Sequence, residues 1–391
     1  MRILLVTNLY PPQELGGYGR SLADFCWGLQ QRGHSIKVLC SDAPYLGASA
    51  AGPSGEPVLR ELLLKGTFEG GVELLQEPER CRQIDQHNSH VVTRLCGAQP
   101  FDGILLGNLD LLGVELLTPL LQLGLPLLHH VGFMVAPFAP GQWPNHPRYT
   151  LVAASQAVRG ALLQAGLPVA NAAVVYPGAR TELFGVEATG RRLPPATPPA
   201  GQRLGSRAYP LKLCFAGLLM GSKGVHTLVD AAVQLHQQGV ALQLTLAGAD
   251  FQPGYWEALQ QLAQAGGFDA MQWVGSLGRP QLARCLGLHH AGVFPSIFPE
   301  AFGIVGAEIQ ASGLALVSSG VGGAAELLSD GIDGLRFEPG NAADLCRQLR
   351  RLVDEPGLLA RLQAAGQQRV RRQFSVTAAA QQLEALWLQS R

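Results

Sequence analysis

Short, almost uniformly apolar runs alternate along the chain with segments whose apolar positions recur every three to four residues. The runs at 2–8, 35–41 and 103–107 predict buried strands of a parallel sheet, because they contain few polar residues and end at Asn, Ser or Gly. Residues 21–32 and 111–121 have the helical spacing. Strand and helix in regular alternation predict a parallel sheet with right-handed crossovers.

The same rhythm continues to residue 178, is interrupted, and then restarts near residue 211. Further strands are expected at 126–131, 150–155, 172–178, 212–217, 242–248, 271–275, 291–296 and 314–320, with helices ending at Gly166 and spanning 225–237, 256–265 and 281–288. The stretch from residue 356 to 391 is predicted to be helical.

A segment rich in Pro, Gly, Ser and Arg, "RRLPPATPPAGQRLGSRAYP" at 191–210, separates the two halves and is typical of an extended linker. We therefore expect one domain at 1–190 and another at 211–370. Both are expected to be Rossmann-like, doubly wound α/β domains. Two such domains facing each other leave a cleft at the carboxyl ends of their strands, where ligands bind.

Composition narrows the class of protein. With 391 residues, 47% apolar and 15% charged, the chain is a globular protein large enough for two cores. Its 29 basic and 29 acidic residues argue against nucleic acid as a partner. Seven cysteines without a CxxC pair, no signal-peptide pattern and no uninterrupted apolar span favour a cytoplasmic protein. The basic run "QQRVRRQF" favours a solvated helix face, with a weak membrane-surface contact as the alternative.

Two carboxylates stand out in the small, apolar stretch "FPEAFGIVGAEIQASG". Glu300 is predicted to lie in a loop and Glu308 on the following helix, which begins near Gly303. The amides between them would form a helix N-terminus suited to a phosphate, while the carboxylates would accept hydrogen bonds from sugar hydroxyls. The alternative is structural: a helix cap at Glu300 and a paired buried acid at Glu308.

Two glycine-containing loops add candidate anion ligands. In "FAGLLMGSKGVHTLVDA" a lysine, Lys223, follows a strand end and precedes a helix, although the pattern is not a P-loop. Gly16 and Gly17 precede the first helix, again without a dinucleotide-binding fingerprint. Each loop alone also fits an ordinary solvated turn. The sequence contains no metal-ligand cluster, so a diphosphate would be neutralised by Lys223 and backbone dipoles.

These motifs together resemble family 4 retaining glycosyltransferases of the GT-B fold. The resemblance rests on the E-x7-E block "EAFGIVGAEIQASGLALVSSGVGGAAELL", on "GLLMGSKGVHTLVDA" and on "YPPQELGG" followed by "LQQRGHSIKVL". It covers most of the chain and is weakest at 46–101 and in the Pro-rich segment. It implies transfer from a nucleoside-diphosphate sugar with retention of configuration, without a metal or other cofactor, and a last helix, 371–391, that packs back on the first domain.

The resemblance also implies roles for individual residues. Glu308 would bind the ribose and Glu300 the donor sugar, while Lys223 would hold the diphosphate. Catalytic roles fall to Lys223, Glu300 and His130. The implied donor-binding set is Gly16, Gly17, Gly217, Lys223, Gly275, Ser276, Leu277, Glu300, Phe302, Gly303, Ile304, Val305 and Glu308.

Two positions depart from the family pattern. Leu218 occupies a place usually held by Arg, which leaves the diphosphate to Lys223. The place of a family histidine falls on Gly132, so either a shifted loop brings His130 to the donor, or His129 and His130 are core residues. A catalytically silent nucleotide-sugar binder is therefore one alternative, and a sugar-nucleotide epimerase or a phosphorylase of the same fold is another. The acceptor, whether small molecule, glycan or lipid-linked, and the oligomeric state stay open.

Overall fold

The computed structural model describes residues 1–48, 51–185 and 202–390. The chain divides into two compact units, one of Met1–Pro177 with Val376–Arg391 and one of Gly178–Ser375. The sequence placed the domain boundaries at 190 and 370 instead. The first division falls earlier because Ala179 N–H donates to the Phe374 carbonyl at 2.7 Å, which ties the chain after Pro177 to the second unit. The expected linker lies outside the described residues as far as residue 201.

The first unit is built on a seven-stranded sheet with the strand order β3-β2-β1-β6-β7-β8-β9, and all of its neighbouring strands are parallel. Its strands are β1 (Arg2–Val6), β2 (Ser35–Ser41), β3 (Val58–Leu62), β6 (Gly103–Leu106), β7 (Leu127–Val131), β8 (Tyr149–Ala153) and β9 (Ala173–Val174). A small antiparallel pair, β4 (Gly66–Thr67) with β5 (Glu73–Leu74), follows β3. The strand order reverses between β1 and β6, so the carboxyl ends of these strands mark a topological switch point.

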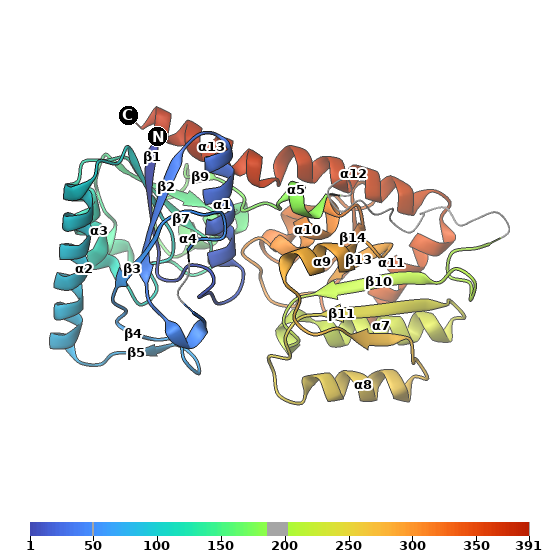
Figure 1. Ribbon diagram of the computed structural model, residues 1–391. Coiled ribbons are helices and arrows are strands. Elements are labelled where there is room, and N and C mark those ends of the chain that lie inside the picture. Colours follow the sequence, from blue (N-terminus) through green and yellow to red (C-terminus); the bar gives the residue numbers. More distant parts are fainter. Residues whose placement is uncertain (49–50, 186–201, 391) are drawn as a thin grey trace. The chain divides into compact units, whose positions relative to one another are not determined.

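Helices cover both faces of this sheet (Figure 1). They are α1 (Tyr18–Gln31), α2 (Pro78–Ala98), α3 (Leu117–Gln122), α4 (Gln156–Gln164) and α13 (Val376–Gln389), with short 3-10 turns at Pro44–Leu46, Val114–Leu116 and Pro140–Gln142. One face packs alternate strand residues such as Ile3, Leu5 and Val38 against α1 and α13 in a single buried cluster. Uniformly apolar strands fit this arrangement because both of their faces are covered.

The predicted helix at 111–121 begins later than expected. Leu111 has a φ of 60°, a left-handed conformation that is uncommon for a residue with a side chain. Its carbonyl accepts a hydrogen bond from Lys65 N–H at 2.6 Å instead of a helical partner. The chain therefore turns at Gly113 (φ 86°), makes one 3-10 turn, and enters α3 only at Leu117.

The second unit repeats the plan with a six-stranded parallel sheet in the order β12-β11-β10-β13-β14-β15. Its strands are β10 (Leu211–Ala216), β11 (Leu242–Ala247), β12 (Met271–Trp273), β13 (Ala291–Phe294), β14 (Ala315–Ser318) and β15 (Leu335–Arg336). The order reverses between β10 and β13. Both units thus have the doubly wound α/β architecture that the sequence predicted.

The helices of the second unit again lie on both faces of the sheet (Figure 1). They are α5 (Thr181–Phe184), α7 (Val225–Gln237), α8 (Tyr255–Ala265), α9 (Arg279–Leu286), α10 (Ile304–Ala311), α11 (Ala342–Asp354) and α12 (Leu358–Gln373), with 3-10 turns at Gly221–Lys223 and Gly323–Leu327. One core joins the strands to α7, α8, α11 and the start of α12. Within the described residues, none of the helices combines the length and apolar character needed to cross a bilayer.

The helical C-terminal region is two helices, because the chain leaves the helical path at Phe374 and Ser375. The second of them, α13, buries Trp387 fully in the core of the first unit. A Cβ at Gly103 would lie 2.9 Å from the Trp387 indole, so the helix packs directly on the backbone of β6. The indole therefore fits against β6 only because residue 103 has no side chain.

We expect Trp387→Ala to lower the free energy of unfolding by about 3–5 kcal/mol, because it removes a fully buried indole and leaves a cavity. Urea unfolding followed by circular dichroism measures the loss. The neighbouring substitution Leu388→Ala is the control, since that side chain is 57% exposed and its loss should cost little. Equal effects of the two substitutions would show that α13 does not complete the core.

Candidate active site

Two loops meet at the switch point of the second unit, one following β10 and one following β13. Ile297 N–H donates to the Ser222 carbonyl at 3.0 Å and joins them. Gly224, which begins α7, has a φ of 67°, and a Cβ there would lie 2.0 Å from the Pro295 carbonyl oxygen. Only glycine allows this approach. The sequence feature "SKG" is thus explained by the contact between the two loops.

This contact brings Lys223 and Glu300 together. Lys223 Nζ donates to Glu300 Oε1 at 2.7 Å, and the Ser296 hydroxyl donates to the same oxygen. The ammonium also lies 4.6 Å from the centre of the Phe298 ring. Both side chains are mostly but not fully covered, with 22% of Lys223 and 11% of Glu300 exposed. An ammonium has three donors, so this pair leaves Lys223 able to bind an anionic ligand as well.

The backbone of Glu300 is held by the glycines that follow β14. Glu300 N–H donates to the Val321 carbonyl at 3.3 Å, and Gly323 N–H donates to the Glu300 carbonyl at 2.7 Å. A Cβ at Gly322 would lie 2.5 Å from that carbonyl oxygen. The "VGG" of the sequence therefore fixes where the carboxylate stands, through a local bridge between Glu300 and Gly322.

Glu308 is bound by a residue that the sequence did not single out. It lies on α10 with only 1% of its side chain exposed, and Arg279 Nη2 lies 3.5 Å from its Oε1. The guanidinium also lies 5.6 Å from the centre of the Phe184 ring. A buried carboxylate needs a partner charge, and the Arg279 guanidinium supplies one. Nothing in the spacing of the two residues, which lie on different helices, indicates this pairing.

The N-terminus of α10 lies between the two glutamates. Gly303 precedes the helix with a φ of 93°, and a Cβ there would lie 2.9 Å from the Phe294 ring. Glycine supplies no side-chain cap, so the first helical amides, including those of Ile304 and Val305, are not capped by the residue that starts the helix. Phe302 is buried, and its ring packs against Phe374. The positive end of a helix thus lies between two carboxylates.

The predicted strand-end glycines lie side by side at the carboxyl edge of β10, β11 and β12. Gly217 N–H donates to the Ala247 carbonyl at 2.9 Å, and Gly248 N–H donates to the Gly275 carbonyl at 2.8 Å. A Cβ at Gly248 would lie 1.7 Å from the Gly217 carbonyl oxygen, so the backbones touch. Beyond them Ser276 is exposed and Leu277 is half-buried. These residues therefore form one continuous part of the carboxyl edge of the second sheet.

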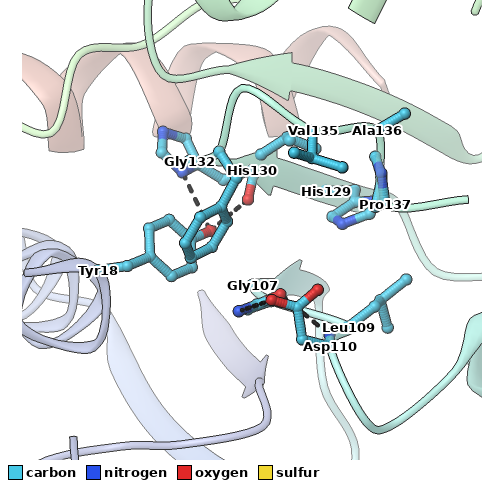
Figure 2. Close-up of a pocket in the computed structure, with 13 residues that line it drawn as sticks. Tyr18, Gly107, Leu109, Asp110, His129, His130, Gly132, Val135, Ala136 and Pro137 are labelled. Carbon is cyan, nitrogen blue, oxygen red and sulfur yellow. Dashed lines mark hydrogen bonds between the residues drawn. The ribbon is translucent and has the colours of Figure 1, made fainter. Parts of the chain in front are cut away.

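Three of the predicted residues, Gly16, Gly17 and His130, belong to the first unit. Gly16 and Gly17 are exposed just before α1, and Gly16 has a φ of 66°. The next residue, Tyr18, joins this loop to the end of β7, because its hydroxyl donates to the His130 carbonyl (Figure 2). The same hydroxyl lies 3.4 Å from His130 Nδ1.

His130 is buried and held by the backbone. Its Nε2 is 2.9 Å from the Val175 carbonyl oxygen, and its ring stacks against that of Tyr18. Burial lowers the pKa of His130 to about 4, and that of His129 to about 3, so both rings are neutral near pH 7. His129 Nδ1 lies 2.7 Å from the Tyr149 hydroxyl. The two histidines therefore have the core contacts that the second of our sequence alternatives described.

Both histidines nevertheless line a hollow of about 250 Å³ at the ends of β6 and β7 (Figure 2). A Cβ at Gly132 would lie 2.1 Å from the Tyr18 ring, so this aromatic ring fills the place where a side chain at 132 would stand. The sequence did not predict this hollow. Among the described side chains, no group of three or more His, Cys, Asp or Glu residues is arranged to hold a metal ion.

The chain is similar to known glycosyltransferases. Residues 202–369 match the family model described as Glycosyl transferases group 1. Glycogen synthase of Mycobacterium tuberculosis (strain CDC 1551 / Oshkosh) is 28% identical, over 96% of this chain and 91% of that protein. D-inositol 3-phosphate glycosyltransferase of Arthrobacter sp. (strain FB24) is 32% identical, over 42% of this chain and 39% of that protein.

Solved structures show the same fold. A glycosyltransferase from Rickettsia africae ESF-5 has a TM-score of 0.78 at 17% identity, covering 100% of this chain and 98% of that one. Anabaena Alr3699/HepE in complex with UDP and glucose has a TM-score of 0.73 at 20% identity, covering 100% of both chains. The fold is therefore GT-B, as predicted, and the comparisons support a glycosyltransferase enzyme whose group 1 match lies in the second unit.

The buried histidines make the stability of the protein depend on pH. In the unfolded chain their pKa is about 6.5, so as the pH falls below that value the unfolded state binds protons that the folded state does not. We expect the free energy of unfolding to decrease between about pH 6.5 and 4, by up to about 1.4 kcal/mol per pH unit for each histidine. His129→Phe, which cannot take up a proton, should reduce that slope in denaturant titrations.

His90→Phe is the control for the chemical change itself, because it makes the same substitution at an exposed position. If His129→Phe and His90→Phe change the slope equally, His129 is not neutral in the folded protein at these pH values.

Proposed function

We propose that this protein transfers a sugar from a nucleoside-diphosphate sugar to an acceptor hydroxyl, with retention of anomeric configuration and without a metal ion. The observation that carries the proposal is the approach of Lys223 to Glu300 beside the N-terminus of α10. A cation, a carboxylate and the amides of a helix N-terminus are the groups that a sugar diphosphate needs, because it presents two phosphates and several hydroxyls close together.

Charge develops on the diphosphate as its bond to the sugar breaks. We propose that Lys223 and the amides of Gly303, Ile304 and Val305 stabilise that charge, since all of them are fixed in place before the reaction. Glu300 would accept hydrogen bonds from the donor sugar while still bound to Lys223. Gly16 and Gly17 keep their predicted role as ligands of an anion. Because Leu218 is uncharged, Lys223 is the side-chain cation that we propose for the diphosphate.

Glu308 is proposed to bind the ribose hydroxyls of the nucleotide. Its carboxylate has several acceptor sites, and Arg279 contacts one of its oxygens. Arg279 holds the carboxylate in place, so its remaining acceptor sites are fixed for the ribose hydroxyls. Gly275, Ser276 and Leu277 would border the base, with Gly217 nearer the phosphates.

The identity of the donor follows from a panel of UDP-, GDP- and ADP-sugars. UDP-glucose is the first to test, because a structural neighbour was solved with UDP-glucose. Release of the nucleoside diphosphate in the presence of an acceptor, with a product of retained configuration by NMR and undiminished activity in a chelator, would support each part of the proposal. An inverted product or loss of activity with chelator would contradict the corresponding part.

A silent nucleotide-sugar binder is the second candidate. Leu218 in place of a cation and the Tyr18 ring over Gly132 favour it, because both remove groups that the resemblance associates with the donor. Slow hydrolysis of the donor in water separates the two candidates. Measurable donor binding without hydrolysis or transfer across the whole panel would favour the silent binder.

We expect Lys223→Ala to lower turnover about 100- to 1000-fold, because the variant loses a fixed cation at the leaving group. Steady-state release of the nucleoside diphosphate measures the change. Lys212→Ala removes the other lysine of the second unit, on β10, and serves as the matched control. Wild-type turnover in Lys223→Ala would remove this lysine from the mechanism.

We expect Glu308→Ala to weaken donor binding about 10- to 100-fold, since it deletes charged hydrogen bonds to the ribose and leaves Arg279 without this carboxylate. Calorimetric titration with the nucleoside diphosphate alone measures the affinity. Glu257→Ala, at an exposed position on α8, is the control. If both variants bind the nucleotide as the wild type does, Glu308 is only a structural partner of Arg279.

A further inference from the structure

The first unit has two hollows, and the segments that line one hollow lie a few positions along the chain from the segments that line the other. The hollow at the ends of β6 and β7 is lined by residues 107–110 and 129–137, together with Tyr18. A second hollow, of about 400 Å³, is lined by residues from 114–121 and 142–146. Asp110 of the first is four positions from Val114 of the second, so their Cα atoms lie at most roughly 14 Å apart. A single elongated ligand can therefore span both hollows.

The first hollow has the size of part of a ligand. Its volume of about 250 Å³ is below the range of about 300–1,000 Å³ that holds a whole drug-sized molecule. On one side it presents Asp110, whose carboxylate accepts a hydrogen bond from Asn108 Nδ2 at 2.9 Å (Figure 2). Phe133, which is 38% exposed and packs against Tyr18, also lines this hollow. A carboxylate and an aromatic ring in one small hollow suit one sugar ring.

The second hollow is lined by neutral polar side chains and one paired acid. Thr118 and Asn145 are exposed in its wall, with His146 and Gln142 beside them. Its acid, Glu115, is bound to Lys65 at 2.8 Å, and Lys65 also contacts Asp85 at 2.7 Å. The one lysine near this wall is thus held by two carboxylates. Such a wall suits uncharged hydroxyl groups and does not suit a phosphate.

Aromatic contacts hold residues 138–146, which directly follow the 129–137 lining segment of the first hollow, against the sheet. Phe138 and Trp143 pack edge to face, Trp143 packs on Tyr149, and Tyr149 contacts His129, which lines the first hollow. These contacts fix residues 138–146 to the sheet, so the distance between the hollows is set by the fold. A preformed pair of hollows at fixed spacing selects for the length of its ligand.

We infer that the acceptor is an uncharged oligosaccharide of at least two sugar rings, with its terminal ring at Asp110 and Phe133 and a preceding ring at Thr118 and Asn145. This inference rests on the proposed function for the reaction itself. In that reaction, an acceptor hydroxyl oxygen bonds to the anomeric carbon as the bond from this carbon to the diphosphate breaks, and the hydroxyl proton passes to the diphosphate. The second hollow adds binding energy for longer acceptors.

Binding of glucose and of the maltose and cellobiose series up to six units tests the inference on the full chain, by calorimetry without donor. We expect affinity to rise from one unit to two or three. The double substitution Thr118→Val with Asn145→Ala should weaken oligosaccharide binding about tenfold or more and shrink the advantage of the longer sugars, because two hydrogen-bonding groups are lost. His90→Ala on α2 is the control and should leave all affinities unchanged.

Binding that does not increase with length, no binding of any sugar in either series, or an equal loss for monosaccharide and oligosaccharide in the double variant would overturn the inference. These outcomes are separate from the failure of the proposed function. A protein that binds the oligosaccharides through this wall but never cleaves a donor would refute the transferase and keep the second hollow as a glycan site.

Discussion

The ion pair between Lys223 and Glu300 is the constraint on which the arrangement of the second unit depends. It requires the loops after β10 and β13 to touch, which in turn requires Gly224 against the Pro295 carbonyl and Gly322 against the backbone of Glu300. Each of these glycines accepts a backbone approach that a side chain would prevent. The positions of the Lys223 and Glu300 side chains therefore depend on two glycines that are distant from both glutamates in the sequence.

Much of this was predictable because it is local. The strands of the parallel sheets, the helix at 225–237 and the two glutamates on either side of a helix start follow from apolar runs and short motifs. What the sequence could not give depends on contacts between distant residues. Arg279 reaches Glu308 from another helix, and the Leu111 carbonyl turns to Lys65 in place of beginning a helix. The strands β3, β4 and β5 lack the uniformly apolar runs of buried strands, since nearly all of their residues are half-buried or exposed.

The two units share one architecture but differ in the charged groups at the carboxyl edges of their sheets. In the second, charged groups gather at the switch point and neutralise one another. In the first, the corresponding edge has neutral buried histidines, aromatic rings and the carboxylate of Asp110, without a lysine or arginine in the described lining of its hollow. Cations suit phosphates, whereas a carboxylate among neutral groups suits uncharged hydroxyls. The electrostatics of each unit, taken alone, therefore supports our proposal that the second unit binds the donor and the first unit binds the acceptor.

The indole of Trp387 on the backbone of Gly103 has a consequence for biosynthesis. The first unit is made of the two ends of the chain, so its hydrophobic core is incomplete while the ribosome is still translating the nearly two hundred residues of the second unit. Until α13 is synthesised, the apolar side chains of α1 that pack against it in the folded protein stay exposed in the nascent chain. Chaperone engagement during synthesis should therefore last longest for the part of the protein that is made first.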